Sequence, residues 1–145
     1  MLQFKKILCP VDFDQNSAAA LHFAYKILDL GGTLYLLHVI PNLYGVATEP
    51  YPPVAELARR NLEHFARSQL GDQIIHDLLV REGDPAALTI QMADELGADL
   101  IVMATHGRKG LARVVLGSVA EKVLREALCP VLTIRPAASK QAASA

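Results

Sequence analysis

The sequence predicts a single α/β domain in which helices cover both faces of a parallel sheet. Strand-like and helix-like segments alternate along the chain, and this alternation implies right-handed crossovers between parallel strands. The chain has 145 residues, enough for one domain with a substantial core. The run TLYLLHVI, Thr33 to Ile40, is almost continuously apolar, which is typical of a strand that is covered on both faces.

Five short apolar segments bounded by turn residues are the expected strands. In chain order they are Phe4 to Pro10, Thr33 to Ile40, Ile74 to Arg81, Asp99 to Ala104 and Pro130 to Arg135. The segments between them carry apolar residues at three- and four-residue spacing, which predicts helices. Their order along the chain predicts a doubly wound, five-stranded sheet.

Four helices are expected between the strands. The first carries an apolar stripe from Ala20 to Leu28 and stops at Gly31-Gly32, because glycine readily ends a helix. The second covers Val54 to Leu70. The third starts at Asp84-Pro85, a capping residue followed by a proline suited to the first helical position. The fourth spans about Val119 to Leu128.

Two segments are expected to lie outside regular structure. Pro41 to Pro53 contains four prolines and is longer than most connections, which favours a lid or a disordered loop. The expected domain is 1–136. Residues 137–145, rich in alanine and serine, are expected to form a flexible tail.

Composition excludes several classes of protein. Fourteen basic and fifteen acidic side chains give a net charge of −1, which argues against binding nucleic acid or a membrane by bulk electrostatics. No apolar run is long enough to span a bilayer, and no targeting segment is expected at the start. Cys9 and Cys129 lie in apolar contexts, as expected for buried, reduced thiols. These features together predict a cytoplasmic protein.

The candidate site is the edge of the sheet where the first and fourth strands end. Ligands of doubly wound sheets bind beyond the carboxyl ends of strands, where the strand order reverses. The first strand ends in Pro10-Val11-Asp12, and the fourth is followed by Thr105-His106-Gly107 and, further on, by Gly117-Ser118. Gly117-Ser118 stands directly before a helix, whose free N–H groups and dipole favour an anion. A plain strand–turn–helix connection explains the same pattern equally well.

Ser118 has two competing interpretations. Ser118 and Glu121 have the spacing of a capping box, which predicts that the fourth helix starts at Ser118. The same hydroxyl can instead bind a phosphate oxygen. Arg108 and Lys109 either add positive charge to such a site or are simply solvated.

Other chemistry is not indicated. The chain has no GxxxxGK[ST] loop and no GxGxxG fingerprint. The histidines are scattered singly, no serine stands in a nucleophile elbow, and Arg81-Glu82 stands where a phosphorylation-receiver domain needs an acceptor aspartate.

The string MATHGRKGLARVVLGSVAEKVLREALCPVLTIR, the start KKILCPVDFDQNSAAAL and the strand LLHVI strongly resemble the universal stress protein family. The resemblance covers the chain apart from its tail. ATP-binding members carry a signature of glycine, two residues, glycine, nine residues, glycine, then serine or threonine. Gly107 matches the second glycine and Gly117-Ser118 the end, whereas Ala104 stands at the first glycine.

The resemblance implies an adenine nucleotide alpha hydrolase-like (Rossmann-like) fold with strand order 3-2-1-4-5. It implies binding of ATP, or ADP or AMP, with Mg or Mn, and Asp12 would face the cation. It also implies a homodimer through the fifth strand (Val131, Leu132, Ile134). The implied nucleotide-binding residues are Pro10, Val11, Asp12, Val39, Met103, Ala104, His106, Gly107, Arg108, Gly117, Ser118 and Val119.

The resemblance favours an ATP-binding regulatory module of the stress response over an enzyme, with an unidentified protein partner. Two alternatives remain open. One is a nucleotide-free stress protein that acts through protein contacts, which Ala104 would explain. The other is a weak ATPase, or a protein that phosphorylates itself at Ser118 or a nearby hydroxyl.

Overall fold

Five strands and four helices alternate along the chain in the computed structural model, which describes residues 3–42, 48, 50–72, 76–105 and 116–135. The strands are β1 (Lys6–Pro10), β2 (Thr33–Pro41), β3 (His76–Gly83), β4 (Leu100–Ala104) and β5 (Val131–Ile134). The helices are α1 (Gln15–Ile27), α2 (Pro52–Leu70), α3 (Pro85–Leu96) and α4 (Ser118–Glu126). All nine expected elements are therefore present.

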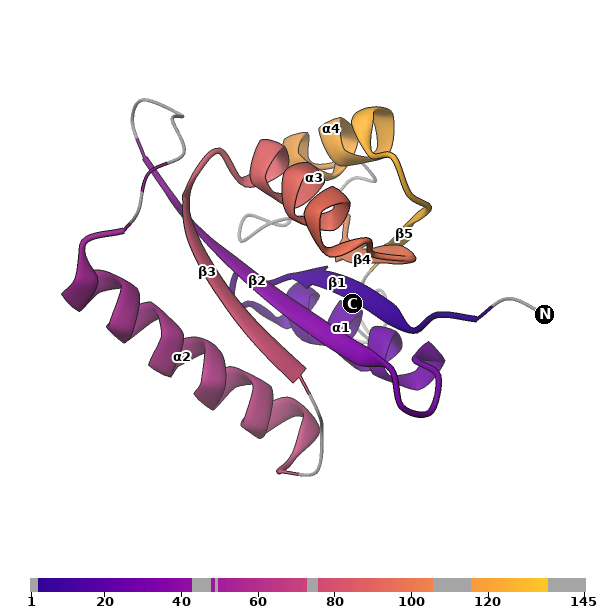
Figure 1. Ribbon diagram of the computed structural model, residues 1–145, viewed down its shortest axis with the longest axis horizontal. Helices are drawn as coiled ribbons and strands as arrows, with labels where there is room; N and C mark the ends of the chain where they lie inside the picture. The colour runs from indigo at the N-terminus through magenta and orange to yellow at the C-terminus, as the bar shows by residue number, and fades with distance from the viewer. Residues whose placement is uncertain (1–2, 43–47, 49, 73–75, 106–115, 136–145) are drawn as a thin grey trace, which may run out of the picture.

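The strands form one parallel sheet in the order β3-β2-β1-β4-β5, which confirms the predicted fold class. β1 lies at the centre of the sheet and is the first strand in the chain. From it the chain builds outward to β2 and β3, then crosses back to β4 and β5 (Figure 1). The strand order therefore reverses between β1 and β4.

Helices α1 and α2 cover one face of the sheet, and α3 and α4 cover the other (Figure 1). Because side chains alternate along a strand, neighbours on β1 serve opposite faces. Ile7 and Cys9 pack with α1 and α2, whereas Leu8 packs with α3 and α4. Each face has its own apolar core, so β1 and the paired β4 are buried from both sides.

The helix starts follow local chemistry. Asp14 Oδ1 accepts a hydrogen bond from the Ser17 N–H (2.8 Å), and Asp84 Oδ2 accepts one from the Ala87 N–H (2.8 Å). These side chains satisfy first-turn donors that have no partner within the helix. The cap at Asp84 confirms the predicted start of the third helix.

Several boundaries differ from the sequence prediction by one to three residues. α2 begins at Pro52, two residues before the expected Val54, because proline lacks an N–H and fits the first helical turn. β2 runs on to Pro41, which shortens the predicted loop. β3 begins at His76 and continues to Gly83; the expected start at Ile74 and the tail 137–145 lie outside the described residues.

The thiols differ in environment. Cys9 is fully buried, and burial raises the pKa of its thiol to about 12. Cys129 is only half-buried, although burial also raises the pKa of its thiol. The expectation of two buried cysteines is thus correct for Cys9 and partly wrong for Cys129. Within the described ranges, no helix is long and apolar enough to cross a membrane.

The packing predicts a contrast between two leucines of α2. Leu62 is fully buried in the core of its face, whereas Leu57 is 59% exposed. Leu62→Ala should lower the free energy of unfolding by about 2–5 kcal/mol, because it removes buried methyl groups and leaves a cavity. Leu57→Ala is the matched control and should change it by less than about 1 kcal/mol. Urea unfolding curves measure both; equal losses would contradict the described orientation of α2.

Candidate functional site

The ends of β1 and β4 that lead into the next segments lie side by side, at the carboxyl end of the sheet. Ile7 pairs with Leu100 and Leu8 with Ile101. Continued at the same offset, this register sets Val11 level with Ala104 and Asp12 level with Thr105. On its other side β1 pairs with β2, and the Val11 N–H donates to the Leu37 carbonyl (2.8 Å). The two segments singled out by the sequence therefore meet where the strand order reverses.

A hydrogen bond joins β4 to the start of α4. The Gly117 N–H donates to the Thr105 carbonyl (2.6 Å), and the Thr105 N–H donates to the Ile134 carbonyl of β5 (3.1 Å). Thr105 is buried, so these bonds are protected from water. The amino end of α4 is thereby fixed beside the end of β4.

The first turn of α4 supplies the donors of this site. The Glu121 N–H bonds to the Gly117 carbonyl (2.9 Å), so Gly117 is the N-cap and Ser118 the first helical residue. Helix geometry leaves the N–H groups of Ser118, Val119 and Ala120 without an acceptor inside the helix. They lie at the positive end of the helix dipole, which favours an anion.

The predicted capping box is wrong. It needs a serine at the N-cap, but Gly117 occupies that position, and the cap makes no side-chain hydrogen bond. The motif was misplaced by one residue because Gly117, held by Thr105, takes the extended cap conformation. Ser118 is exposed, so its hydroxyl is not used to cap the helix.

Ala104 has ordinary strand geometry. It is the last residue of β4, pairs with Ile134 and is half-buried. Phe13 is the one described non-glycine residue with a positive φ, so Ala104 needs none of glycine's conformational freedom. Alanine in place of glycine thus imposes no backbone strain here.

Asp12 is oriented by its own loop. Ser17 Oγ donates to Asp12 Oδ1 (2.6 Å) and accepts from the Asp12 N–H (3.0 Å). The Asp14 N–H also approaches Asp12 Oδ1 (3.3 Å). These contacts fix the carboxyl group at the end of β1, beside the end of β4.

Phe13 has strained backbone geometry. Its φ is 69°, a left-handed conformation that crowds the Cβ of a residue other than glycine and costs about 1–3 kcal/mol. Its ring centroid lies 4.5 Å from that of His38 and 5.7 Å from that of Phe65. His38 Nδ1 lies 2.9 Å from the Val11 carbonyl; because that oxygen only accepts, Nδ1 is the protonated ring nitrogen.

Asp14 carries a perturbed carboxyl group. Burial raises its pKa, and the neighbouring Asp12 carboxyl raises it further, against the lowering effect of the Ser17 N–H. Its Oδ2 is buried without a hydrogen-bond partner in the described part of the chain. Asp14 therefore caps α1 at an electrostatic cost.

The remaining predicted residues divide between the two faces. Val39, Met103 and Val119 contribute to the core under α3 and α4, whereas Val11 contributes to the core under α1 and α2. Pro10 ends β1 and is half-buried. His106, Gly107 and Arg108 lie outside the described residues. Among those described, no three His, Cys, Asp or Glu side chains gather as a metal-binding group.

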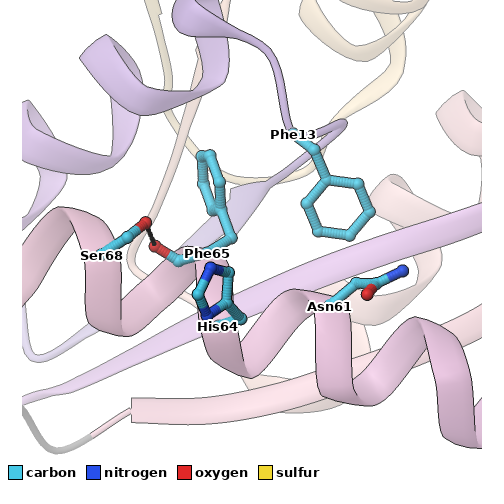
Figure 2. A pocket seen from close by; sticks show the side chains of 5 residues that line it. All are labelled: Phe13, Asn61, His64, Phe65 and Ser68. Atoms are coloured by element: carbon cyan, nitrogen blue, oxygen red, sulfur yellow. Dashed lines mark hydrogen bonds between the residues drawn. The ribbon is translucent and has the colours of Figure 1, made fainter.

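A hollow of about 290 Å³ lies against α2, lined by Phe13, Asn61, His64, Phe65 and Ser68. Figure 2 shows the Phe13 ring extending toward α2 from the loop after β1, with the other four side chains on that helix. Ser68 Oγ donates to the Phe65 carbonyl (2.8 Å). The hollow therefore borders the Asp12 loop from the side of α2.

Sequence reasoning missed Ser17, Phe13 and His38. The Asp14-to-Ser17 spacing is a capping signal that could have located Ser17. Nothing in the sequence marks Phe13 as left-handed, because the conformation depends on contacts with β2 and α2. His38 looked like an isolated packed histidine for the same reason.

A sequence profile described as the universal stress protein family matches residues 3–135. The chain belongs to the universal stress protein family. It is 32% identical over 142 residues to universal stress protein MJ0531 of Methanocaldococcus jannaschii, covering 91% of this chain and 82% of that protein. It is 34% identical to universal stress protein A homolog 2 of Coxiella burnetii, covering 93% and 97%.

Solved structures show the same fold. The structure of MJ0577 superposes with a TM-score of 0.78 at 26% identity, covering 95% of this chain and all of that one. An Arabidopsis thaliana family member with AMP bound gives a TM-score of 0.62 at 20% identity, covering 94% of each chain. A universal stress protein in complex with cAMP also gives 0.62, at 23% identity, covering 92% and 98%. These last two likenesses establish the fold alone.

The Asp14 environment predicts a pH-dependent effect of Asp14→Asn. Because the folded pKa lies above the unfolded value, the stability that Asp14 contributes is complete below the unfolded pKa and is lost as the pH rises through the folded pKa. Asparagine still caps the helix but cannot ionise. Urea unfolding from pH 3 to 7 should therefore show Asp14→Asn gaining stability relative to the wild type as pH rises.

Asp14→Ala separates the effect of capping from the effect of ionisation. It also removes the cap, so its free energy of unfolding should be about 1 kcal/mol lower than that of Asp14→Asn at every pH. A relative loss of stability in Asp14→Asn with rising pH would contradict the described burial.

Proposed function

We propose that this protein is an adenine-nucleotide-binding regulatory module, with ATP as the main ligand and ADP or AMP as related ones. The observation that carries the proposal is the hydrogen bond from Gly117 to Thr105. It brings the first turn of α4 to the point where the ends of β1 and β4 meet. In this proposal, the backbone donors and dipole of α4 and the Asp12 carboxylate would border one binding space.

In this proposal the α- to γ-phosphates lie against the first turn of α4. The N–H groups of Ser118, Val119 and Ala120 supply directional donors, and the exposed Ser118 hydroxyl adds another. Half-buried Pro10 and Val39 would border the adenosine, whereas Val11 and Met103 lie buried in the cores behind this site. Ala104 imposes no conformational obstacle, since its φ is not positive. His106, Gly107 and Arg108 would complete the phosphate side.

Asp12 is the residue that would meet a divalent cation. A single carboxylate suits Mg²⁺, which keeps several waters and takes its remaining ligands from the nucleotide phosphates. Such a cation would neutralise phosphate charge, so nucleotide and metal would bind together.

The relatives support adenine nucleotides as the ligand class. Two members with this fold were solved with AMP and with cAMP. Nucleotide would act as a ligand that selects one conformation of the module or one partner protein, in line with a role in the cytoplasmic stress response.

Nucleotide binding has a direct test in isothermal titration calorimetry with ATP and Mg²⁺. The wild type should bind, and Ser118→Ala should bind about tenfold more weakly, because a hydrogen bond to a charged group contributes about 1.5 kcal/mol. Ser68→Ala, an exposed serine of α2, is the matched control and should bind like the wild type.

No binding of ATP, ADP or AMP by the wild type would overturn the proposal. If Ala104→Gly then created affinity, a nucleotide-free role through protein contacts would take its place.

We further propose a twofold homodimer through β5, because the two edges of the sheet differ. On β3 the outward carbonyls of Leu78, Val80 and Glu82 accept hydrogen bonds from Arg59 Nη1, Arg81 Nη1 and the Thr48 N–H, at 2.9–3.2 Å. These contacts block strand addition at β3. Within the described residues, the backbone hydrogen-bond partners of β5 are β4 and Thr105, the residue after it, which leaves the outer edge of β5 available.

The apolar side chains of β5 also favour a dimer interface at this edge of the sheet. Val131, Leu132 and Ile134 are half-buried in the single chain, so a second copy would remove their remaining exposed surface from water. A twofold axis beside β5 would pair two such strands.

Thr133→Pro tests the dimer. The carbonyls of Pro130 and Ile134 point toward β4, so the alternate residue Thr133 directs its N–H outward. Proline there removes a donor of the dimer while sparing the bonds to β4. Sedimentation velocity at micromolar concentrations should show a dimeric wild type and a monomeric Thr133→Pro. Thr133→Val keeps the N–H and should remain dimeric; a dimeric Thr133→Pro would refute pairing through β5.

A further inference from the structure

The loop between β1 and α1 is held from both sides. On the helix side, Ser17 makes reciprocal hydrogen bonds with Asp12. On the sheet side, His38 of β2 bonds to the Val11 carbonyl, and its ring lies tilted against the Phe13 ring. Asp12 therefore lies between Val11 and Phe13, which His38 contacts, while Ser17 holds its carboxyl group.

Phe13 is the link between this loop and α2. Its ring meets that of Phe65 edge to face, at 74° and 5.7 Å between centroids, and the same ring borders the hollow against α2 (Figure 2). The hollow leaves one side of the ring uncovered. The ring packs at the margin of the core of this face, between His38 and Phe65, and is not completely enclosed.

We propose that Phe13 is a positioning residue for the nucleotide site, and that its ring, held between His38 and Phe65, keeps in place the loop backbone from which the Asp12 carboxylate projects. This inference rests on the proposed function where it concerns nucleotide, but the positioning itself is a property of the free protein. Because Phe65 belongs to α2, a shift of α2 reaches the Asp12 loop through the Phe13 ring. The state of α2 and the affinity for metal-bound nucleotide are therefore coupled, in both directions.

Phe13→Asn separates the effect of the ring from the effect of the backbone conformation. Asparagine tolerates a left-handed φ better than other residues with a Cβ, so the loop can keep its path while the contacts with His38 and Phe65 are lost. Phe23→Asn is the matched control, because Phe23 is 39% exposed on α1 and has no part in the loop. Phe13→Tyr keeps the ring and should behave like the wild type.

The first measurement needs no nucleotide. The Asp12 N–H donates to Ser17 Oγ, so its hydrogen exchange, followed by NMR, reports how firmly the loop is held. Phe13→Asn should speed this exchange at least about tenfold, equivalent to about 1.4 kcal/mol, while amides of β4 keep their rates. Unchanged Asp12 exchange would overturn the inference.

The second measurement compares ATP affinity with and without Mg²⁺. Mg²⁺ should raise the ATP affinity of Phe13→Asn much less than that of the wild type, because Asp12 would no longer face the cation. Its affinity without metal should remain within about threefold of the wild type. An equal loss with and without Mg²⁺ would mark Phe13 as merely structural and overturn the inference.

The outcomes separate the two proposals. If the wild type binds no nucleotide, the proposed function fails, and the exchange rates alone decide whether Phe13 positions the loop. If Phe13→Asn does not fold, Phe65→Leu removes the ring contact from the α2 side and should produce the same pattern with smaller changes. Wild-type behaviour of Phe65→Leu in both measurements would contradict the coupling.

Discussion

β1 pairs with β2 on one side and with β4 on the other, and this central position governs the rest of the molecule. Because the chain builds outward from β1 in both directions, the connections after β1 and β4 leave toward opposite faces of the sheet. The edge between them is consequently not covered by a crossover helix. Asp12, Thr105 and the start of α4 all gather at this edge.

The site is built from backbone more than from side chains. The Gly117 N–H is used to hold α4 against Thr105, so the donors left for a ligand belong to the next three residues. Such donors are rigid, since the helix and the sheet fix them. Asp12 is different, because its direction depends on a loop whose strained residue, Phe13, is held by rings from β2 and α2. In the proposed site, the phosphate side would therefore be preorganised, whereas the cation side would depend on how firmly this loop is held.

Much of this arrangement could be predicted from sequence because it follows local rules. The near-continuous apolar run of β2, the Asp84-Pro85 start of α3 and the ends of β1 and β4 are marked by residues close to one another in the chain. The N-cap of α4 was assigned to Ser118 instead of Gly117, because the cap depends on Thr105, twelve residues before Gly117. The left-handed Phe13 and the protected edge of β3 were missed since they depend on His38, Phe65, Arg59 and Thr48, which other parts of the chain supply.

The central claim concerns where adenine nucleotide binds, and amide chemical shifts of the labelled protein titrated with ATP and Mg²⁺ test it most directly. We expect saturable shifts in Asp12, Thr105 and the first turn of α4, with residues 61–68 of α2 changing less. Shifts confined to α2, or no saturable shifts at all, would contradict the account.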